Sequence, residues 1–289
     1  MQKYEEIKQY SEEQFRRLTG VKKNTFAEMV SVLVEAENNR YRRAGRKSSL
    51  TMEDRLLMAL EYLREYRTYF HLGSSYGLSE SACYRSCKWV EDVLIKSGKF
   101  ALPGRKALLK SEVAYEVVLV DATESPIQRP KKKVRAGKKI KHRNNKQKYY
   151  YSGKKKRHTI KSQIVVDKGS KKVICTSFSN GKRHDFRLFK ESKVRWVKEV
   201  RGLVDSGYTG IKHLQANTGV PKKSSKKRPL TKEEKIENRK ISSERALNEN
   251  VIGMLKRFKI ITDRYRNRRK RFGLRFNLIA GIYNFELPT

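Results

Sequence analysis

The chain has 289 residues, and its 69 lysines and arginines against 30 aspartates and glutamates give a formal net charge of +39. A compact fold with this much self-repulsion points to a polyanionic partner. Because 37% of the residues are hydrophobic, the chain is not a disordered basic tail, and it has no run of about 18 apolar residues that would span a membrane. We therefore expect a soluble, cytoplasmic protein of two domains.

In the first hundred residues, apolar side chains recur at the three-to-four spacing of helices. The pattern predicts a helix over 24–37 and another over 55–63, the second preceded by a capping sequence at 51–54. We therefore expect an all-helical N-terminal domain over residues 1–105.

A turn between two further helices in this domain indicates a helix-turn-helix. A short helix ends at Gly77, and Ser79 caps a following helix that carries Tyr84, Arg85 and Lys88. We expect these three side chains to contact DNA. A plain helical hairpin would have the same pattern, but the positive charge of the chain favours DNA binding.

Residues 102–104 mark a boundary, after which strand-like patterns alternate with helical ones. The pattern predicts helices over 186–192 and 242–260, and strands over 115–120, 148–152, 158–166, 172–177 and 202–205. Strands followed by mixed helices and strands predict an α+β fold, an α/β-type layer around one sheet, over residues 106–289.

Two segments of this second domain are rich in positive charge. No acidic residue lies between Glu124 and Asp167, and sixteen lysines and arginines fall within 129–161. Ten more fall within 256–275, where Asp263 is the one acid. Ordinary solvated surfaces mix both signs, so we expect these segments to contact phosphates.

Two aspartates follow apolar strand patterns. Asp121 follows the apolar run 117–120, and Asp205 follows 203–204 and precedes a tight turn. Carboxylates at the ends of neighbouring strands can hold hard divalent cations such as Mg²⁺, which prefer oxygen ligands. For either residue alone, an aspartate that caps its own turn is the better interpretation.

A third acid, Glu249, lies on the predicted helix over 242–260. Arg245 precedes it by four residues and Lys256 follows by seven, so these side chains project from roughly one face. Basic residues on both sides of a carboxylate fit a site that holds a metal ion and a phosphate together. The alternative is a simple surface pair of Arg245 with Glu249, which contributes about 0.3–0.5 kcal/mol.

Several motifs in this part of the chain match a known family. They are, in chain order, 120–124 (VDATE), 151–161 (YSGKKKRHTIK), 181–186 (GKRHDF), 205–208 (DSGY) and 243–256. The chain resembles the DDE transposases of the insertion-sequence-five family, within the group that includes insertion-sequence-four and Harbinger-type enzymes. The most specific match is the order Arg245, three residues, Glu249, six residues, Lys256, although the family has a tyrosine where this chain has Ser242.

The resemblance implies an RNase H-like catalytic domain in which Asp121, Asp205 and Glu249 are catalytic and bind two Mg²⁺ or Mn²⁺ ions. It further implies a transposase of a bacterial-type insertion sequence that binds terminal inverted repeats, cleaves DNA and transfers the strand into a target. We expect a homodimer or a larger assembly on the DNA. Asp185 is an alternative second aspartate, but it begins a helix rather than ending a strand.

Other residues of the matched motifs are candidates by the same resemblance. The predicted DNA contacts are Arg245, Lys256, Lys154, Lys155, Lys156, Arg157, Lys161 and Arg183. His158 and His184 are candidates to line the site, with a packing role as the alternative for each. The segment at about 130–148 is interpreted as a basic insertion that contacts DNA. The alternative functions are an RNase H-like nuclease or domesticated transposase relative, and a non-catalytic nucleic-acid-binding protein.

Overall fold

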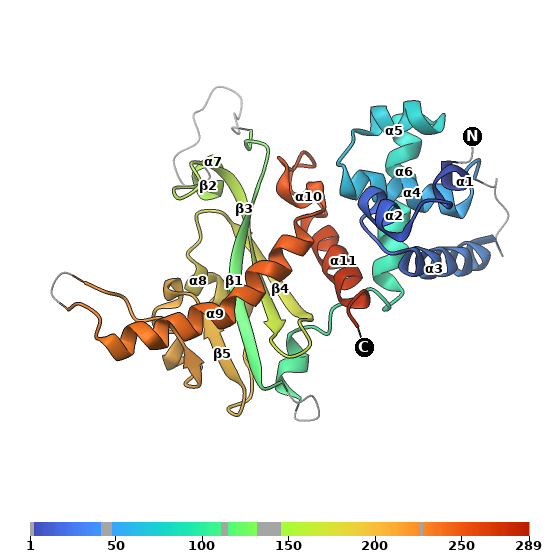
Figure 1. Cartoon of the computed structure of the whole chain (residues 1–289). Helices are drawn as coiled ribbons and strands as arrows, with labels where there is room; N and C mark the ends of the chain where they lie inside the picture. Colours follow the sequence, from blue (N-terminus) through green and yellow to red (C-terminus); the bar gives the residue numbers. More distant parts are fainter. Residues whose placement is uncertain (1–2, 42–47, 111–114, 132–145, 226–227, 289) are drawn as a thin grey trace, which may run out of the picture. The chain divides into compact units, whose positions relative to one another are not determined.

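The computed structural model describes residues 3–41, 48–110, 115–131, 146–225 and 228–288, and the chain divides into two compact units (Figure 1). Unit 1 comprises Met1–Ala101, Leu255–Asp263 and Leu274–Thr289, and unit 2 comprises Leu102–Met254 and Arg264–Gly273. Two C-terminal segments thus belong with the N-terminal helices, whereas the sequence pattern placed them in the second domain. In the described ranges, no helix is both long and apolar enough to cross a membrane.

Unit 1 is helical, and its helix ends follow from local capping chemistry. The Thr51 hydroxyl accepts a hydrogen bond from the Asp54 N–H at 3.1 Å and so begins a helix at the predicted cap. Gly77 adopts the left-handed conformation, with φ of 65°, and ends the next helix, after which the Ser79 hydroxyl accepts from the Ala82 N–H at 3.3 Å. The described helices are α1 (Lys3–Ile7), α2 (Glu12–Thr19), α3 (Lys23–Tyr41), α4 (Met52–Arg64), α5 (Tyr69–Tyr76), α6 (Glu80–Lys96), α10 (Lys259–Thr262) and, for most of its length, α11 (Phe272–Phe285).

Helix α6 has one buried face and one exposed face. Cys83 and Cys87 are free thiols that are fully buried on the inner face. Tyr84, Arg85 and Lys88, the predicted DNA contacts, are exposed, and the Tyr84 residue is 43% exposed. The two helices and their tight turn therefore have the predicted helix-turn-helix layout, with the three candidate side chains available on the surface.

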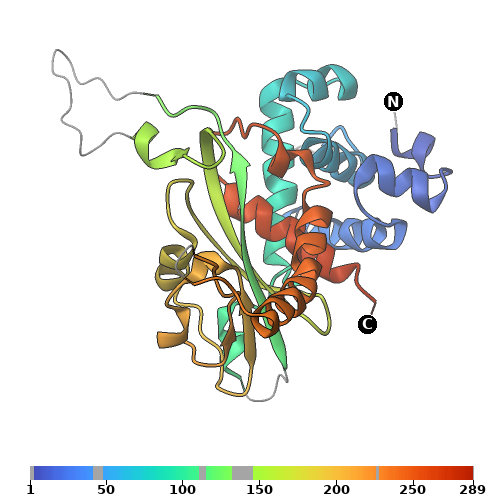
Figure 2. The same cartoon turned by 60° about the vertical axis from the view of Figure 1, so that its left-hand side comes forward.

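Unit 2 contains a mixed sheet with β1 at its centre. β1 pairs antiparallel with β3 and parallel with β5, while β3 also pairs with β2 and β4, and β5 with β6. Figure 2 shows β1, in green, running beside β3. The described strands are β1 (Val117–Pro126), β2 (Tyr151–Ser152), β3 (Arg157–Asp167), β4 (Val173–Asn180), β5 (Arg201–Val204) and β6 (Thr218–Gly219). The predicted mixture of helices and sheet is confirmed.

Two of the predicted strands differ from the observed ones. β1 continues to Pro126 because residues 121–126 pair with 159–164 of β3, so Asp121 lies within the strand rather than after it. Residues 146–150 form the short helix α7 (Lys146–Tyr150). Of the predicted strand 148–152, Tyr151 and Ser152 form β2 and pair with His158 and Arg157 of β3, whereas residues 148–150 are helical.

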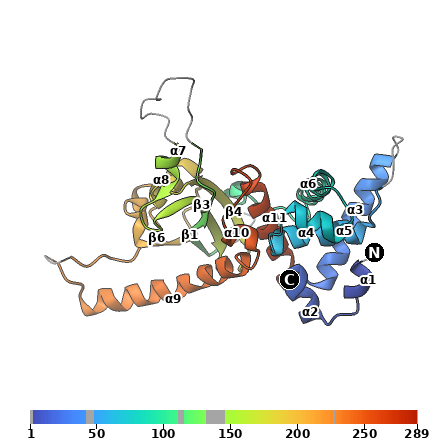
Figure 3. The same cartoon turned by 90° about the horizontal axis from the view of Figure 1, so that it is seen from above.

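Helix α9 (Lys232–Leu255) lies along one face of the sheet (Figure 3). It packs closely there, since a Cβ added at Gly219 of β6 would lie 2.7 Å from Leu203 and 3.7 Å from Ile241 of the helix. The predicted bounds of 242–260 are wrong at both ends. Helical structure begins earlier at Lys232, and the chain turns after Leu255 before α10.

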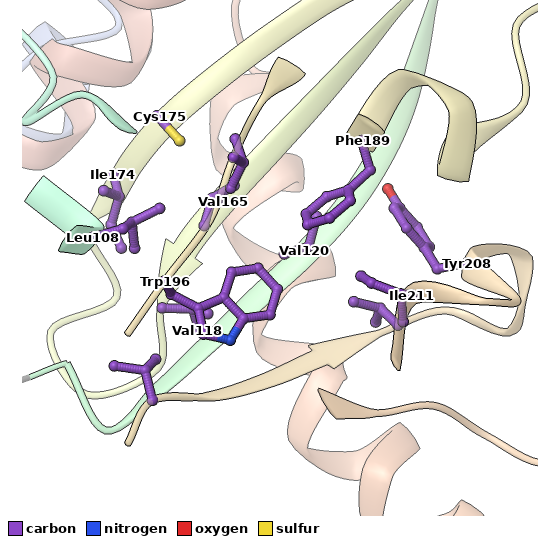
Figure 4. Packing of buried hydrophobic residues seen from close by; sticks show 13 residues of the cluster. Leu108, Val118, Val120, Val165, Ile174, Cys175, Phe189, Trp196, Tyr208 and Ile211 are labelled. Carbon is purple, nitrogen blue, oxygen red and sulfur yellow. The ribbon is translucent and has the colours of Figure 1, made fainter. Parts of the chain in front are cut away.

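The other face of the sheet carries the main hydrophobic core of unit 2 (Figure 4). Val118 and Val120 point to this face because side chains alternate along a strand. They pack with Phe189 of α8 (Asp185–Ser192) and with Tyr208 of the 3₁₀ turn η3 (Ser206–Tyr208), whose rings meet edge to face with centroids 6.2 Å apart. The core therefore holds the start of α8 close to the turn that follows β5.

Candidate active site

Asp121 and Asp205 are neighbours in the sheet. β1 and β5 are parallel and pair Val120 with Val204, so the next residue of each chain segment is an aspartate. The Ala122 N–H donates to Asp121 Oδ1 at 2.8 Å, and the Ser206 N–H donates to Asp205 Oδ1 at 2.7 Å. Asp205 follows a strand end, as predicted, and also caps the turn after it.

The guanidinium of Arg245, from α9, lies beside both carboxylates. Its Nη2 is 3.8 Å from Asp121 Oδ1, and its Nη1 is 3.5 Å from Asp205 Oδ1. The Arg245 side chain is 14% exposed and that of Asp205 is 47% exposed, so the group opens to solvent at Asp205. One guanidinium facing two carboxylates leaves the group with net negative charge.

The electrostatics of the group favour an additional cation. Burial raises the pKa of the Asp121 carboxyl; a backbone N–H and Arg245 lower this pKa, and Asp205 and Asp185 raise it. Burial also raises the pKa of the Tyr208 hydroxyl, and the three aspartates add to that effect. A cation among these oxygens would stabilise the charged carboxylates.

Asp185 approaches the same group from the start of α8. A Cβ added at Gly207 would lie 3.4 Å from Asp185 Oδ2 and 3.8 Å from Asp205 Oδ2. A glycine at position 207 therefore leaves room for both carboxylates. Asp185 was the predicted alternative to Asp205 as the second aspartate, and the structure brings both carboxylates close to Gly207.

Lys161 holds the other oxygen of Asp185. Its Nζ donates to Asp185 Oδ1 at 2.7 Å and to the Arg183 carbonyl at 2.6 Å, and it lies 3.8 Å from Glu124 Oε1. The register of β1 with β3 places Lys161 directly opposite Glu124. Lys161 is 8% exposed and its ammonium group has partners inside unit 2, so the structure does not present it on the surface as the predicted DNA contact would require.

We expect Lys161→Met to lower the free energy of unfolding by about 3 kcal/mol. The substitution would leave the Glu124 and Asp185 carboxylates in a largely buried position without their cation. Urea unfolding of the full chain would measure the loss, and Lys161→Arg, which keeps the charge, should lose less. Equal stability of the Met variant and the wild type would contradict this role.

Comparisons with known proteins show the family to which the chain belongs. A family model described as "DDE superfamily endonuclease" matches residues 120–284. A protein of Microchaete diplosiphon, described as "Probable transposase for insertion sequence element IS702", is 44% identical over 285 residues, which cover 99% of this chain and 98% of that protein. The chain belongs to the DDE superfamily of endonucleases. No solved structure matches it.

A second match concerns the N-terminal half of this DDE superfamily endonuclease. A model described as "Helix-turn-helix of DDE superfamily endonuclease" matches residues 48–100, the range that contains α4, α5 and α6. The predicted helix-turn-helix is thereby confirmed. Together the matches confirm the predicted insertion-sequence transposase with a DNA-binding region and an endonuclease region.

The third predicted acid, Glu249, is exposed on α9. It follows Arg245 by one helical turn, a spacing that puts the two Cβ atoms about 5–6 Å apart. In the part of the chain that the structure describes, no three histidine, cysteine, aspartate or glutamate side chains are close enough together to hold a metal ion. The structure therefore brings together Asp121 and Asp205, but not Glu249. Lys256 lies just past the end of α9 rather than on its face.

The predicted DNA contacts near β3 differ in exposure. Lys154, Lys155, Lys156 and Arg157 are exposed where the chain turns from β2 into β3. Arg183 is half-buried, and its Nε lies 3.3 Å from Glu191 Oε2. Most of the predicted basic insertion, residues 132–145, lies outside the described residues.

The two candidate histidines lie in different places. His158 is near the start of β3, whereas Asp121 pairs with Ile164 six residues further along, so His158 does not line the aspartate group. Burial lowers the pKa of His158, and Arg129 adds to the effect. His184 is exposed and directly precedes Asp185 at the start of α8. Glu124 and Tyr208 also lie near the aspartates but were not predicted as neighbours of the site, although both stand in matched motifs.

The residues present fit a divalent cation. Carboxylate oxygens are the donors that Mg²⁺ and Mn²⁺ prefer, and Asp121 and Asp205 offer them from adjacent strands. Burial raises the pKa of Asp121 and repulsion from Asp205 and Asp185 adds to the effect, and a bound cation would relieve that repulsion. DDE superfamily endonucleases use divalent metal ions.

Proposed function

We propose that unit 2 is an RNase H-like domain that uses Mg²⁺ or Mn²⁺ to cut the ends of an insertion sequence at its terminal inverted repeats and to join them to target DNA. The observation that carries the proposal is the pairing of Asp121 with Asp205 beneath the guanidinium of Arg245. The central position of β1, between an antiparallel and a parallel neighbour, supports the RNase H-like assignment. The spacing of Arg245, Glu249 and Lys256 supports membership of the insertion-sequence-five family.

In this proposal, Asp121 and Asp205 hold two divalent ions together with Glu249. Glu249 follows Arg245 by one turn of α9, and this spacing supports its inclusion in the proposed site. When bound, such ions activate the attacking oxygen and stabilise the leaving oxygen of an in-line displacement at phosphorus. The side chains of the protein position the ions and the phosphate, and this positioning supplies the catalysis.

Arg245 has two partners in the proposed reaction. It offsets part of the charge of Asp121 and Asp205 in the free protein, and its fork of N–H donors suits a phosphate oxygen when DNA is bound. The exposed residues Tyr84, Arg85 and Lys88 of α6 bind the repeat sequence. We further propose a homodimer or larger assembly on DNA, since joining requires two transposon ends.

The test is a strand-transfer assay with the DNA that flanks the reading frame. A duplex that carries the flanking inverted repeat is incubated with protein, Mg²⁺ and a supercoiled target plasmid. The proposal expects both cut ends and plasmids joined to the ends. Cut ends without joined products would favour the RNase H-like nuclease, and neither product would favour a non-catalytic binding protein.

Arg245→Ala should lower the melting temperature of the chain in EDTA by a few degrees, and millimolar MgCl₂ should restore most of the loss. Without the guanidinium, the two aspartates repel each other until a cation occupies the site. Scanning calorimetry of both proteins with and without MgCl₂ would measure the effect. An equal response of wild type and variant to MgCl₂ would contradict the proposed position of the cation.

A further inference from the structure

Three basic segments of unit 2 meet at the end of the sheet beyond Asp121. β1 ends at Pro126, and Ile127 forms a parallel bridge with Tyr265, which comes from the other end of the sequence. The Tyr265 N–H donates to the Pro126 carbonyl at 2.9 Å, and the Gln128 N–H donates to the Tyr265 carbonyl at 3.1 Å. The segment Arg264–Gly273 is thereby attached to the strand that carries Asp121.

The region around α7 joins the same place. Gln147 Nε2 donates to the Pro130 carbonyl at 2.7 Å, which ties α7 to the chain that leaves β1. The guanidinium of Arg269 lies over the ring of Tyr150, 4.5 Å from its centroid. Three segments are therefore neighbours, namely 126–131, 146–157 and 264–271. We call their lysines and arginines the basic end surface.

The basic end surface carries charge of one sign. The three segments contain fourteen lysines and arginines and no aspartate or glutamate. Most of these residues are exposed. The exposed ones are Arg129, Lys131, Lys146, Lys148, Lys154, Lys155, Lys156, Arg157, Arg264, Arg266, Arg268 and Lys270. Positive charge at this density is costly to a fold and is typical of a phosphate-binding surface.

The turn at 268–271 is held in an unusual conformation by buried aromatic anchors. Arg268, Arg269 and Arg271 have φ of 48°, 71° and 61°, a left-handed backbone that disfavours residues other than glycine. Tyr265 and Phe272, both buried, pack edge to face on either side of the turn, and the Tyr265 hydroxyl donates to the Lys270 carbonyl at 2.6 Å. Strain of this kind, fixed by the surrounding structure, is common at sites that bind a ligand.

We propose that the basic end surface grips the phosphate backbone of duplex DNA about five base pairs from the phosphate that is cut at Asp121 and Asp205. Five residues of β1 separate Asp121 from Pro126, which spans about 16 Å, or about five base-pair steps of 3.4 Å. The inference rests on the proposed function for the position of the cut. Phosphates, rather than unpaired bases, are the partner because cations outnumber the exposed rings of Tyr149 and Tyr151.

The first test compares two triple variants that remove equal charge from exposed positions of unit 2. Arg264→Gln, Arg268→Gln and Lys270→Gln alter the basic end surface, whereas Lys106→Gln, Lys110→Gln and Lys198→Gln lie toward the Val117 end of β1. Fluorescence anisotropy would follow the binding of the full chain to a 40-base-pair duplex over a range of salt. The first set should weaken binding about 10-fold or more at 0.1 M salt and reduce the slope of log K against log salt by about 2–3.

The second set should leave affinity and slope close to those of the wild type. Equal effects of the two sets would overturn the proposal, as would a first set that weakens binding to single-stranded RNA but not to duplex DNA. If the wild type failed to bind or cut any DNA, the proposed function itself would fall. The two failures are therefore distinguishable.

The second test locates the contact. A photo-crosslinking amino acid in place of Arg268 would be activated on a duplex with a mapped cleavage point. Crosslinks within about eight base pairs of that point are expected. Crosslinks confined to more distant positions would overturn the proposed distance between the basic end surface and the cut phosphate. The same probe in place of Lys106 serves as the control and should give no crosslink in that interval.

Discussion

Asp121→Asn is expected to reduce DNA cleavage by about 10³-fold or more and to leave DNA binding as tight as in the wild type or tighter. Asp121 is the most buried of the paired carboxylates, and its charge is needed to hold a divalent cation beside Asp205. Loss of a negative charge next to the DNA phosphates cannot weaken their electrostatic attraction to the protein. Cleavage of an end-containing duplex and anisotropy on the same duplex would measure the two effects.

The asparagine variant should also fold. It keeps the volume of the side chain and an oxygen that can accept from the Ala122 N–H, and it removes repulsion from two nearby aspartates. Glu199→Gln, the same charge change at an exposed position of unit 2, is the matched control and should cleave normally. Mg²⁺-dependent cleavage by Asp121→Asn at the wild-type rate would remove Asp121 from the site.

Arg275→Met is expected to lower the free energy of unfolding of unit 1 by about 3–5 kcal/mol. Arg275 Nε, on α11, donates to Glu91 Oε1 of α6 at 2.7 Å, and the two side chains are 3% and 1% exposed. The guanidinium also lies over the ring of Tyr62, 5.0 Å from its centroid. Removing one partner of such a buried pair leaves the other charge without compensation in an apolar surrounding.

Trp89 and Trp196 are the two tryptophans of the chain and lie in different units, so a Trp196→Phe background would let fluorescence report on unit 1 during urea unfolding. The double variant Arg275→Met with Glu91→Leu should recover most of the loss, because neither charge is then left alone. Lys99→Met, which breaks an exposed pair with Glu28, is the control and should cost at most about 1 kcal/mol. A similar loss in Arg275→Met and Lys99→Met would contradict the prediction.

Features with local causes were predictable from the sequence. Thr51, Gly77 and Ser79 begin or end helices as expected, because caps depend on a side chain or a φ angle within four residues. Asp205 follows a strand, because the apolar residues before it and the turn residues after it are adjacent in sequence. For the same reason, the helix-turn-helix could be recognised before any contact was known.

Features that depend on pairing were not predictable in the same way. The end of β1 was predicted at residue 120, but β3 supplies partners as far as Pro126 and extends the strand through polar residues. Lys161 is a basic residue in a basic run, which is typical of a DNA contact. The register of β1 with β3 nevertheless places it opposite Glu124 and beside Asp185. Arg275 lies at the end of a basic run in the sequence, yet in the structure it is buried on α11 and paired with Glu91 of α6.

The sequence alone shows the residue types that a site could use: a large excess of positive charge suited to a polyanion, and aspartates after apolar strand patterns suited to a cation. The tertiary structure decided which of these residues meet. Parallel pairing of β1 with β5 joins Asp121 to Asp205, α9 adds Arg245, and the bridge from Ile127 to Tyr265 connects segments nearly 140 residues apart into one basic surface. Charge and polarity are properties of each residue, whereas strand register and helix packing depend on the whole chain. The residue types of the candidate site could therefore be predicted from the sequence, but their arrangement could not.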